Sequence, residues 1–144
     1  VWPKGHYEKL IKLCKEKIPL LPIIQLGGKD CERLSGVDQA FLGQNFELTK
    51  WIIKNSLCHI DCEGGLVHLA TQLDTKCIVI FGPTPVHMYG YEQNVNIVNS
   101  VCNNCMGLHD EWAYCCYQLE TPNLCMKSIE PQTVLAEIQL IKGD

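Results

Sequence analysis

The sequence predicts an α/β domain with a Rossmann-like parallel sheet that carries helices on both faces. Short apolar runs of strand length alternate along the chain with longer segments of helical spacing, an order typical of parallel sheets. The run Cys77–Phe81 is apolar at every position, as expected for a strand that is buried on both faces. Glycine-containing turns follow several of these runs, and the carboxyl ends of parallel strands are where open α/β sheets bind ligands.

The first elements are expected before residue 45. An apolar stripe of helical spacing, with lysines on the opposite face, predicts a helix over residues 7–17. A short buried strand over residues 21–26 then ends at a Gly-Gly pair. Residues 29–33 are expected to form a loop that opens a short helix, and residues 40–42 a brief strand.

The alternation continues through the rest of the chain. Asn45 is a good N-cap for a helix that places Leu48, Trp51, Ile52 and Asn55 on one side. The remaining elements are expected, in order, as a strand over residues 57–60, a helix over 65–73, the strand Cys77–Phe81, a strand over 94–98 and a last helix that begins with Pro131 and buries Val134, Leu135, Ile138 and Ile141.

Composition narrows the class of protein. A chain of 144 residues with 47% hydrophobic and 19% charged residues fits one globular domain with a proper core. The net charge of −4 and the lack of a basic run argue against a nucleic-acid partner. Apolar runs are too short to span a bilayer, no signal peptide is visible, and cysteines scattered through core elements favour a reducing cytoplasm.

Residues 60–70 contain the most informative motif, a strand end followed by Gly64-Gly65 and a helix with His68 in its first turn. The first N–H groups of a helix lack partners, the helix dipole is positive there, and glycine lets an anion approach. The motif therefore predicts a phosphate site. The plainer interpretation is a tight strand–helix turn beside a core histidine, in which Asp61 caps the turn and Thr84 of the following turn bonds its own backbone.

Several motifs, in the same order along nearly the whole chain, resemble the C-terminal half of glycosyltransferase family 9, the bacterial lipopolysaccharide heptosyltransferases and their relatives. The segments that carry the resemblance are Trp2-Pro3 with Tyr7 and Leu10, Ile24-Gln25-Leu26-Gly27-Gly28, Glu63-Gly64-Gly65-Leu66-Val67-His68-Leu69-Ala70, Phe81-Gly82-Pro83-Thr84, Cys102-Asn103-Asn104-Cys105, Cys125-Met126, and Ile129-Glu130-Pro131 with Val134.

The resemblance implies a two-domain GT-B fold of which residues 1–144 are the C-terminal, donor-binding domain. The N-terminal acceptor domain, with the family's aspartate base, is expected outside this chain, as is the basic residue that usually precedes the Trp-Pro pair. The full-length protein is therefore expected to be an enzyme and this fragment to be inactive alone. The implied reaction moves a sugar, with ADP-heptose the best-known donor, to a lipid-linked acceptor of the lipopolysaccharide type.

The family motif Asp-Ser-Gly-Leu-Met-His falls on Glu63-Gly64-Gly65-Leu66-Val67-His68. Glu63, at the family's acidic position, departs from it by one methylene, so the hydroxyl that it holds can differ. Glu32 resembles, more loosely, the acidic residue that contacts the donor's ribose. The amides of Gly64, Gly65 and Leu66 would stabilise charge on the leaving diphosphate, with a further hydrogen bond from His68.

No cofactor is expected for catalysis. The motif lacks the acidic cluster that a Mg²⁺ site needs, which fits a metal-independent donor site. The implied partners are a nucleotide-sugar donor and, through the other domain, a lipid-linked saccharide. The implied location is the cytoplasm, with peripheral attachment to the inner membrane compatible with such an acceptor.

A separate cysteine cluster lies in the aromatic-rich loop 102–126. Cys102-x2-Cys105 has the spacing of a zinc knuckle, and Cys116 and Cys125 complete a candidate structural zinc site. Adjacent Cys115 cannot ligate comfortably together with Cys116, and His109 is a substitute ligand. Free thiols or a disulfide explain the same pattern, whereas Cys14, Cys58, Cys62 and Cys77 fit buried free thiols.

Two other classes of function remain open from the sequence. One is a non-catalytic nucleotide- or sugar-binding Rossmann-like module. The other is a zinc-stapled interaction domain whose functional surface is the cysteine-rich loop. An N-terminal half with an aspartate base would favour the transferase, and loss of partner binding on chelation would favour the interaction domain.

Overall fold

The strand β4 (Cys77–Phe81) lies at the centre of the fold and separates two hydrophobic cores. Each of its five residues is at most 1% exposed. Ile78 and Ile80 face one core, whereas Cys77, Val79 and Phe81 face the other, because successive side chains of a strand point to opposite sides. The prediction of a continuous apolar strand buried on both faces is confirmed.

The computed structural model describes residues 1–102, 104–108, 110–112, 116 and 122–143. Its elements in chain order are α1 (Lys4–Lys17), β1 (Ile24–Gly27), β2 (Gln39–Leu42), α2 (Phe46–Lys54), β3 (His59–Cys62), α3 (Gly65–Gln72), β4 (Cys77–Phe81), α4 (Val86–Tyr89), β5 (Val95–Val98), α5 (Leu124–Lys127) and α6 (Pro131–Gly143). The chain is thus an α/β protein with parallel strands flanked by helices.

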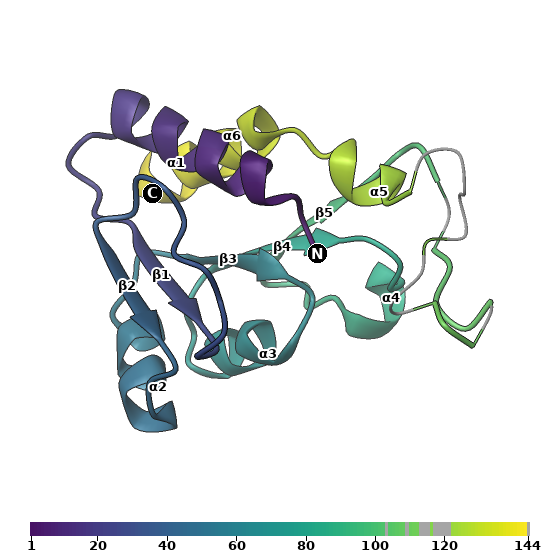
Figure 1. Ribbon diagram of the computed structural model, residues 1–144, viewed down its shortest axis with the longest axis horizontal. Helices are drawn as coiled ribbons and strands as arrows, with labels where there is room; N and C mark the ends of the chain where they lie inside the picture. Colours follow the sequence, from purple (N-terminus) through teal and green to yellow (C-terminus); the bar gives the residue numbers. More distant parts are fainter. Residues whose placement is uncertain (103, 109, 113–115, 117–121, 144) are drawn as a thin grey trace.

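Helices cover the strands on two sides (Figure 1). Helices α1 and α6 pack side by side on one face, where their apolar residues join Ile78 and Ile80 in the first core. Helices α2 and α3 lie on the other face and supply Ile53, Val67 and Ala70 to the second core. This layering is compatible with the Rossmann-like fold that the alternation of elements predicted.

The strands form two parallel sheets rather than the single sheet that the sequence predicted. One sheet has the order β3-β4-β5, and the other pairs β1 with β2. Each of β1 and β3 therefore has one edge without a strand partner among the described residues. The prediction went wrong because alternation of elements indicates parallel pairing but does not say which edges meet.

Several predicted elements are confirmed. Asn45 caps α2, with its side-chain oxygen accepting a hydrogen bond from the N–H of Leu48 at 2.9 Å. The helix expected at residues 65–73, the strand at 94–98, the brief strand at 40–42 and the last helix at Pro131 occur as α3, β5, β2 and α6. Residues Val134, Leu135 and Ile138 of α6 are buried, as expected.

Other expectations were wrong in boundary or burial. The first helix begins at Lys4, three residues earlier than expected. The strand expected over residues 21–26 is β1, which begins at Ile24 and is only half-buried because it lies at a sheet edge. Strand β3 runs from His59 to Cys62, two residues later than predicted, since the register that pairs His59 with Cys77 selects this segment.

Contacts between distant residues decide two further local features. The loop expected over residues 29–33 is present, but it opens no short helix, because the Gln25 side chain donates to the carbonyl of Glu32 and accepts from the N–H of Leu34, both at 2.8 Å. In α2 the residues that pack inward are Ile52 and Ile53, whereas Trp51 is 63% exposed. Contact with α3 and β4, which the local spacing does not reveal, decides which face is buried. The short helices α4 and α5 were not anticipated.

We expect hydrogen exchange to report the two-sheet arrangement directly. Amides of β4, which pairs on both sides, should exchange most slowly, whereas the amides of β1 and β3 that point to the unpaired edges should exchange about 100-fold faster or more. Exchange measured residue by residue by NMR tests this. Equal protection on both edges of β1 and β3 would show that the two sheets join in solution.

Candidate functional site

The turn between β3 and α3 lies at the carboxyl end of the three-stranded sheet. Strand β3 ends at Cys62, and the N–H of Glu63 donates to the carbonyl of Ile80 at 3.3 Å, so the turn is tied to the central strand. Helix α3 begins at Gly65 with Gly64 as its N-cap residue. The predicted residues Glu63, Gly64, Gly65, Leu66 and His68 are thereby brought together.

The first N–H groups of α3 have no acceptor within the described part of the chain. None of the described residues accepts a hydrogen bond from the N–H of Gly64, Gly65 or Leu66, and Gly64 has no side chain to cap the helix. The first N–H groups to find a partner are those of Val67 and His68, which donate to the carbonyl of Gly64. Unpaired N–H groups at the positive end of a helix dipole attract an anion.

The two glycines are not required by the turn itself. Gly64 has a φ of 168°, which is extended backbone that any residue adopts. A Cβ at Gly64 would lie 3.8 Å from the carbonyl oxygen of Cys62, an ordinary van der Waals contact, and a Cβ at Gly65 would meet nothing within 4 Å. The interpretation of a glycine-dependent tight turn therefore has no geometric support. Open space above bare backbone is what an approaching ligand needs.

His68 contacts polar groups through both ring nitrogens. Its Nδ1 lies 2.9 Å from the hydroxyl of Tyr91, and its Nε2 lies 3.6 Å from Oε1 of Glu63. The side chain of His68 is 37% exposed and that of Glu63 17% exposed. His68 is therefore not a core histidine, because it stands at the surface of the turn between a carboxylate and a phenol.

Tyr91 is a site residue that the sequence analysis missed. It lies in the loop between α4 and β5, and its ring meets that of His68 edge-on at a centroid distance of 5.6 Å. Two groups hold its carbonyl in place: the N–H of Asn94 at 3.1 Å and the side-chain amide of Asn96 at 2.9 Å. Because Tyr91 is 23 residues from His68, no local motif links them.

Glu32 lies on the loop after β1 and is bound to another residue. Its carboxylate accepts a hydrogen bond from Nζ of Lys4 at 2.5 Å, which lowers the pKa of Glu32. Within the described part of the chain, no hydrogen bond or ion pair joins Glu32 to the Glu63–His68 turn. Glu32 is connected to the end of β3 through the N-terminal segment. Lys4 of that segment binds Glu32, and Trp2, two residues before it, donates its N–H to Sγ of Cys62 at 3.2 Å.

Two neighbouring polar residues behave as ordinary structural groups. Oδ1 of Asp61 accepts a hydrogen bond from the N–H of Cys62 at 2.7 Å, within β3, so Asp61 does not cap the first turn of α3. Thr84 is 8% exposed, which leaves its hydroxyl little access to a ligand at the surface.

The cysteines of the loop 102–126 cluster near the same sheet edge. Met106 donates its N–H to the carbonyl of Pro83 at 3.1 Å, and a Cβ at Gly82 would lie 3.6 Å from Sγ of Cys125. Burial raises the pKa of Cys125 to about 11, and the nearby thiol of Cys102, to which it is hydrogen bonded, adds to this shift. Burial also raises the pKa of Cys105, with contributions from Cys116 and Cys102.

These thiols are neighbours, but they do not form a finished metal site. Among the described residues, which include all four predicted ligands, no group of three or more His, Cys, Asp or Glu side chains is placed to hold a metal ion. All of the described cysteines are free thiols. His109 and Cys115 lie outside the described residues. The free thiols predicted at Cys14, Cys58, Cys62 and Cys77 are confirmed; Cys14 and Cys77 are buried as expected, whereas Cys58 and Cys62 are only partly buried.

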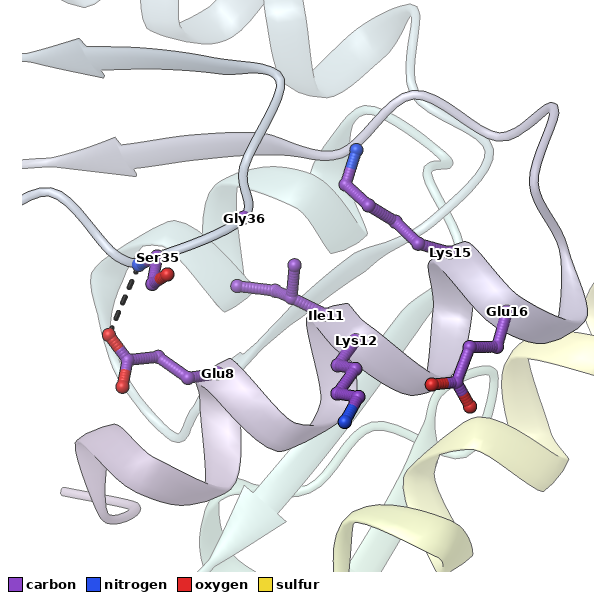
Figure 2. Close-up of a pocket in the computed structure, with 7 residues that line it drawn as sticks. All are labelled: Glu8, Ile11, Lys12, Lys15, Glu16, Ser35 and Gly36. Carbon is purple, nitrogen blue, oxygen red and sulfur yellow. Dashed lines mark hydrogen bonds between the residues drawn. The ribbon is translucent and has the colours of Figure 1, made fainter.

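A groove of about 440 Å³ lies elsewhere, between α1 and the loop that carries Ser35 and Gly36 (Figure 2). Glu8 accepts a hydrogen bond from the N–H of Ser35, and two glutamates and two lysines of α1 line the groove: Glu8, Lys12, Lys15 and Glu16. None of its lining residues belongs to the β3–α3 turn. With charges of both signs and no preorganised donors facing inward, this groove lacks the features of an anion site.

Comparison with known proteins gives no match: no family model, no curated protein and no solved structure resembles the chain significantly. No helix in the described part of the chain is long and apolar enough to cross a membrane.

Substitution of the glycines tests whether the turn needs them for folding. Gly64→Ala and Gly65→Ala are each expected to change the free energy of unfolding by less than about 1 kcal/mol, because neither added Cβ meets the protein. Gly82→Ala is the matched control, since its Cβ would lie 2.5 Å from Sδ of the buried Met126 and should cost about 1–3 kcal/mol. Urea unfolding measures all three, and a large loss in the first two would restore the structural interpretation.

Proposed function

We propose that this chain is the donor-binding domain of a GT-B glycosyltransferase of the heptosyltransferase type. The enzyme would transfer a sugar from a nucleotide-sugar donor to a lipopolysaccharide-type acceptor, and ADP-heptose is the first candidate for the donor. The acceptor-binding half and the catalytic base belong, in this proposal, to a domain outside these residues. The protein would act in the cytoplasm, at the inner membrane where a lipid-linked acceptor is found.

One observation carries the proposal. Three consecutive N–H groups at the start of α3, those of Gly64, Gly65 and Leu66, have no acceptor among the described residues, and open space lies above the two glycines. A diphosphate has the charge and the acceptor oxygens to satisfy such groups. The position also agrees, because this turn follows a parallel strand at its carboxyl end, next to the central strand.

The proposed chemistry is displacement at the anomeric carbon of the donor sugar. An acceptor hydroxyl forms the new C–O bond, its proton passes to the base of the other domain, and the bond to the diphosphate breaks with its electron pair leaving on oxygen. Negative charge therefore grows on the diphosphate. Preorganised N–H groups and the His68 ring would stabilise that charge, and Glu63 would orient a sugar or ribose hydroxyl.

The first test is a titration of this chain with ADP, UDP, GDP and CMP, followed by amide NMR. We expect saturable shifts at Gly64, Gly65 and His68 with one nucleotide, and that nucleotide names the donor's base. Millimolar affinity is sufficient for half of a cleft to be detected in this way. If no nucleotide shifts these residues in this chain or in the full-length protein, the donor-site proposal is wrong.

A glycine variant separates ligand binding from folding. Gly64→Ala should leave the fold intact but weaken nucleotide binding by about 10-fold or more, because the new methyl occupies the space over the unpaired amides. Gly143→Ala is the control, since its Cβ also meets nothing within 4 Å but lies at the end of α6. Equal nucleotide affinity in both variants would contradict the placement of the phosphates.

We also propose that Cys102, Cys105, Cys116 and Cys125 hold a structural metal ion, with zinc as the first candidate. What supports this is the neighbourhood of these thiols, their Cys-x2-Cys spacing, and the lack of regular structure around Cys102 and Cys105. The ligands would be thiolates, whereas burial raises the pKa of Cys105 and Cys125 and so favours their neutral thiols. Metal binding must therefore release protons.

Metal content and its pH dependence test this second proposal. Protein loaded with zinc should bind one ion per chain, and affinity should fall as the pH is lowered, because protons compete for the thiolates. Cys102→Ser and Cys125→Ser should each abolish stoichiometric binding, while Cys31→Ser, at an exposed thiol outside the loop, should not. Substoichiometric zinc in the unsubstituted protein would exclude a structural metal site.

A further inference from the structure

The geometry points to Tyr91 as a positioning residue that fixes the tautomer and orientation of His68, so that Nε2–H is presented at the β3–α3 turn. This inference deepens the proposed donor site and rests on it for its function. The geometric part, the Tyr91–His68–Glu63 chain, stands on contacts within the protein.

The proton positions follow from the charges around the ring. Nε2 of His68 faces Oε1 of Glu63 at 3.6 Å, and a carboxylate oxygen can only accept a hydrogen bond. A lone pair on Nε2 directed at that oxygen would be repelled, which favours the proton on Nε2, but a distance of 3.6 Å is too long for a hydrogen bond that would fix it there. Nδ1 is then the acceptor, and the hydroxyl of Tyr91, 2.9 Å away, donates to it.

The loop that carries Tyr91 is fastened to α3 at a second point, one helical turn further on. The side-chain amide of Asn94 donates to Oγ1 of Thr71 at 2.8 Å, and that hydroxyl donates to the carbonyl of Val67. Asn94 and Thr71 are both buried, at 8% and 6% exposure. His68 and Thr71 are three residues apart on α3 and therefore lie on the same face of the helix. The loop between α4 and β5 thus forms hydrogen bonds to that face at two points.

Gly90 lets the loop approach this closely. A Cβ at Gly90 would lie 2.6 Å from the carbonyl oxygen of Val86 and 3.2 Å from the side-chain nitrogen of Asn96. The backbone of the loop therefore sits against α4 and β5 and carries Tyr91 into fixed contact with His68.

The hydrogen bond from Tyr91 determines which ring nitrogen of His68 can donate to a bound anion. With Nδ1 occupied by Tyr91, the only proton that neutral His68 can offer is on Nε2, on the side of the Glu63 carboxylate and the turn. A phosphate oxygen over the unpaired amides could accept it. A ring without the Tyr91 hydrogen bond would share its proton between both nitrogens and rotate about its side-chain torsions, which weakens such a donor.

The test combines ¹⁵N NMR of the His68 ring with nucleotide titration, in the unsubstituted chain and in Tyr91→Phe. At a pH of about 8, where ordinary histidines are neutral, we expect the unsubstituted protein to hold the Nε2–H tautomer and Tyr91→Phe to show a mixture. Affinity for the nucleotide that binds should fall about 3- to 10-fold in Tyr91→Phe, the effect of one lost hydrogen bond.

Two control variants separate positioning from loop stability. Asn94→Ala removes the second fastening and should lower thermal stability while the His68 tautomer is retained. Tyr89→Phe removes a nearby hydroxyl that makes no hydrogen bond to a described residue and should change neither readout. An Nδ1–H tautomer in the unsubstituted protein, or an unchanged tautomer in Tyr91→Phe, would overturn the inference.

The outcomes also distinguish this inference from the donor-site proposal. If the tautomer responds as expected but no nucleotide binds, the positioning role stands and the donor site fails. If a nucleotide binds and Tyr91→Phe changes neither tautomer nor affinity, the donor site stands and the role of Tyr91 fails.

Discussion

The structure depends first on the burial of β4 between two cores. A strand buried on both faces leaves its backbone groups no water to bond, so they must pair with neighbouring strands. β4 does this with β3 on one side and β5 on the other. Its side chains alternate between the two faces and pack against α1 and α6 on one side and against α2 and α3 on the other. Both cores would be lost with this strand.

The carboxyl edge of that sheet is also where the polar features gather. Glu63 is tied to Ile80 of β4, and the Cys-rich loop is tied to Pro83 just after that strand. Parallel strands end at one edge, so turns that are distant in sequence become neighbours there. The candidate donor site and the proposed metal loop are thus on the same edge of the sheet. A metal ion that ordered the loop would therefore also fix residues that neighbour the donor site.

The turn combines a rigid frame with groups left unpaired. Hydrogen bonds to β4 and within α3 fix the backbone of the turn, yet the first amides of α3 have no acceptor among the described residues. The backbone conformation and the space around Gly64 and Gly65 do not require glycine at either position. Unpaired polar groups are tolerated at a surface because water satisfies them. A ligand that replaces this water meets donors already in place, which is the condition for strong electrostatic stabilisation.

The sequence by itself determined the class of fold, the central strand, the cap of α2 and the contiguous part of the candidate site. These depend on local periodicity, on one capping side chain and on residues adjacent in the chain, so Glu63, Gly64, Gly65, Leu66 and His68 were found together. The tertiary structure decided the rest. Which sheet edges meet, why Trp51 faces outward and why the loop at residues 29–33 opens no helix all depend on contacts between distant segments. The pairing of His68 with Tyr91 is of the same kind, since α3 and the loop between α4 and β5 create it and no spacing in the sequence encodes it.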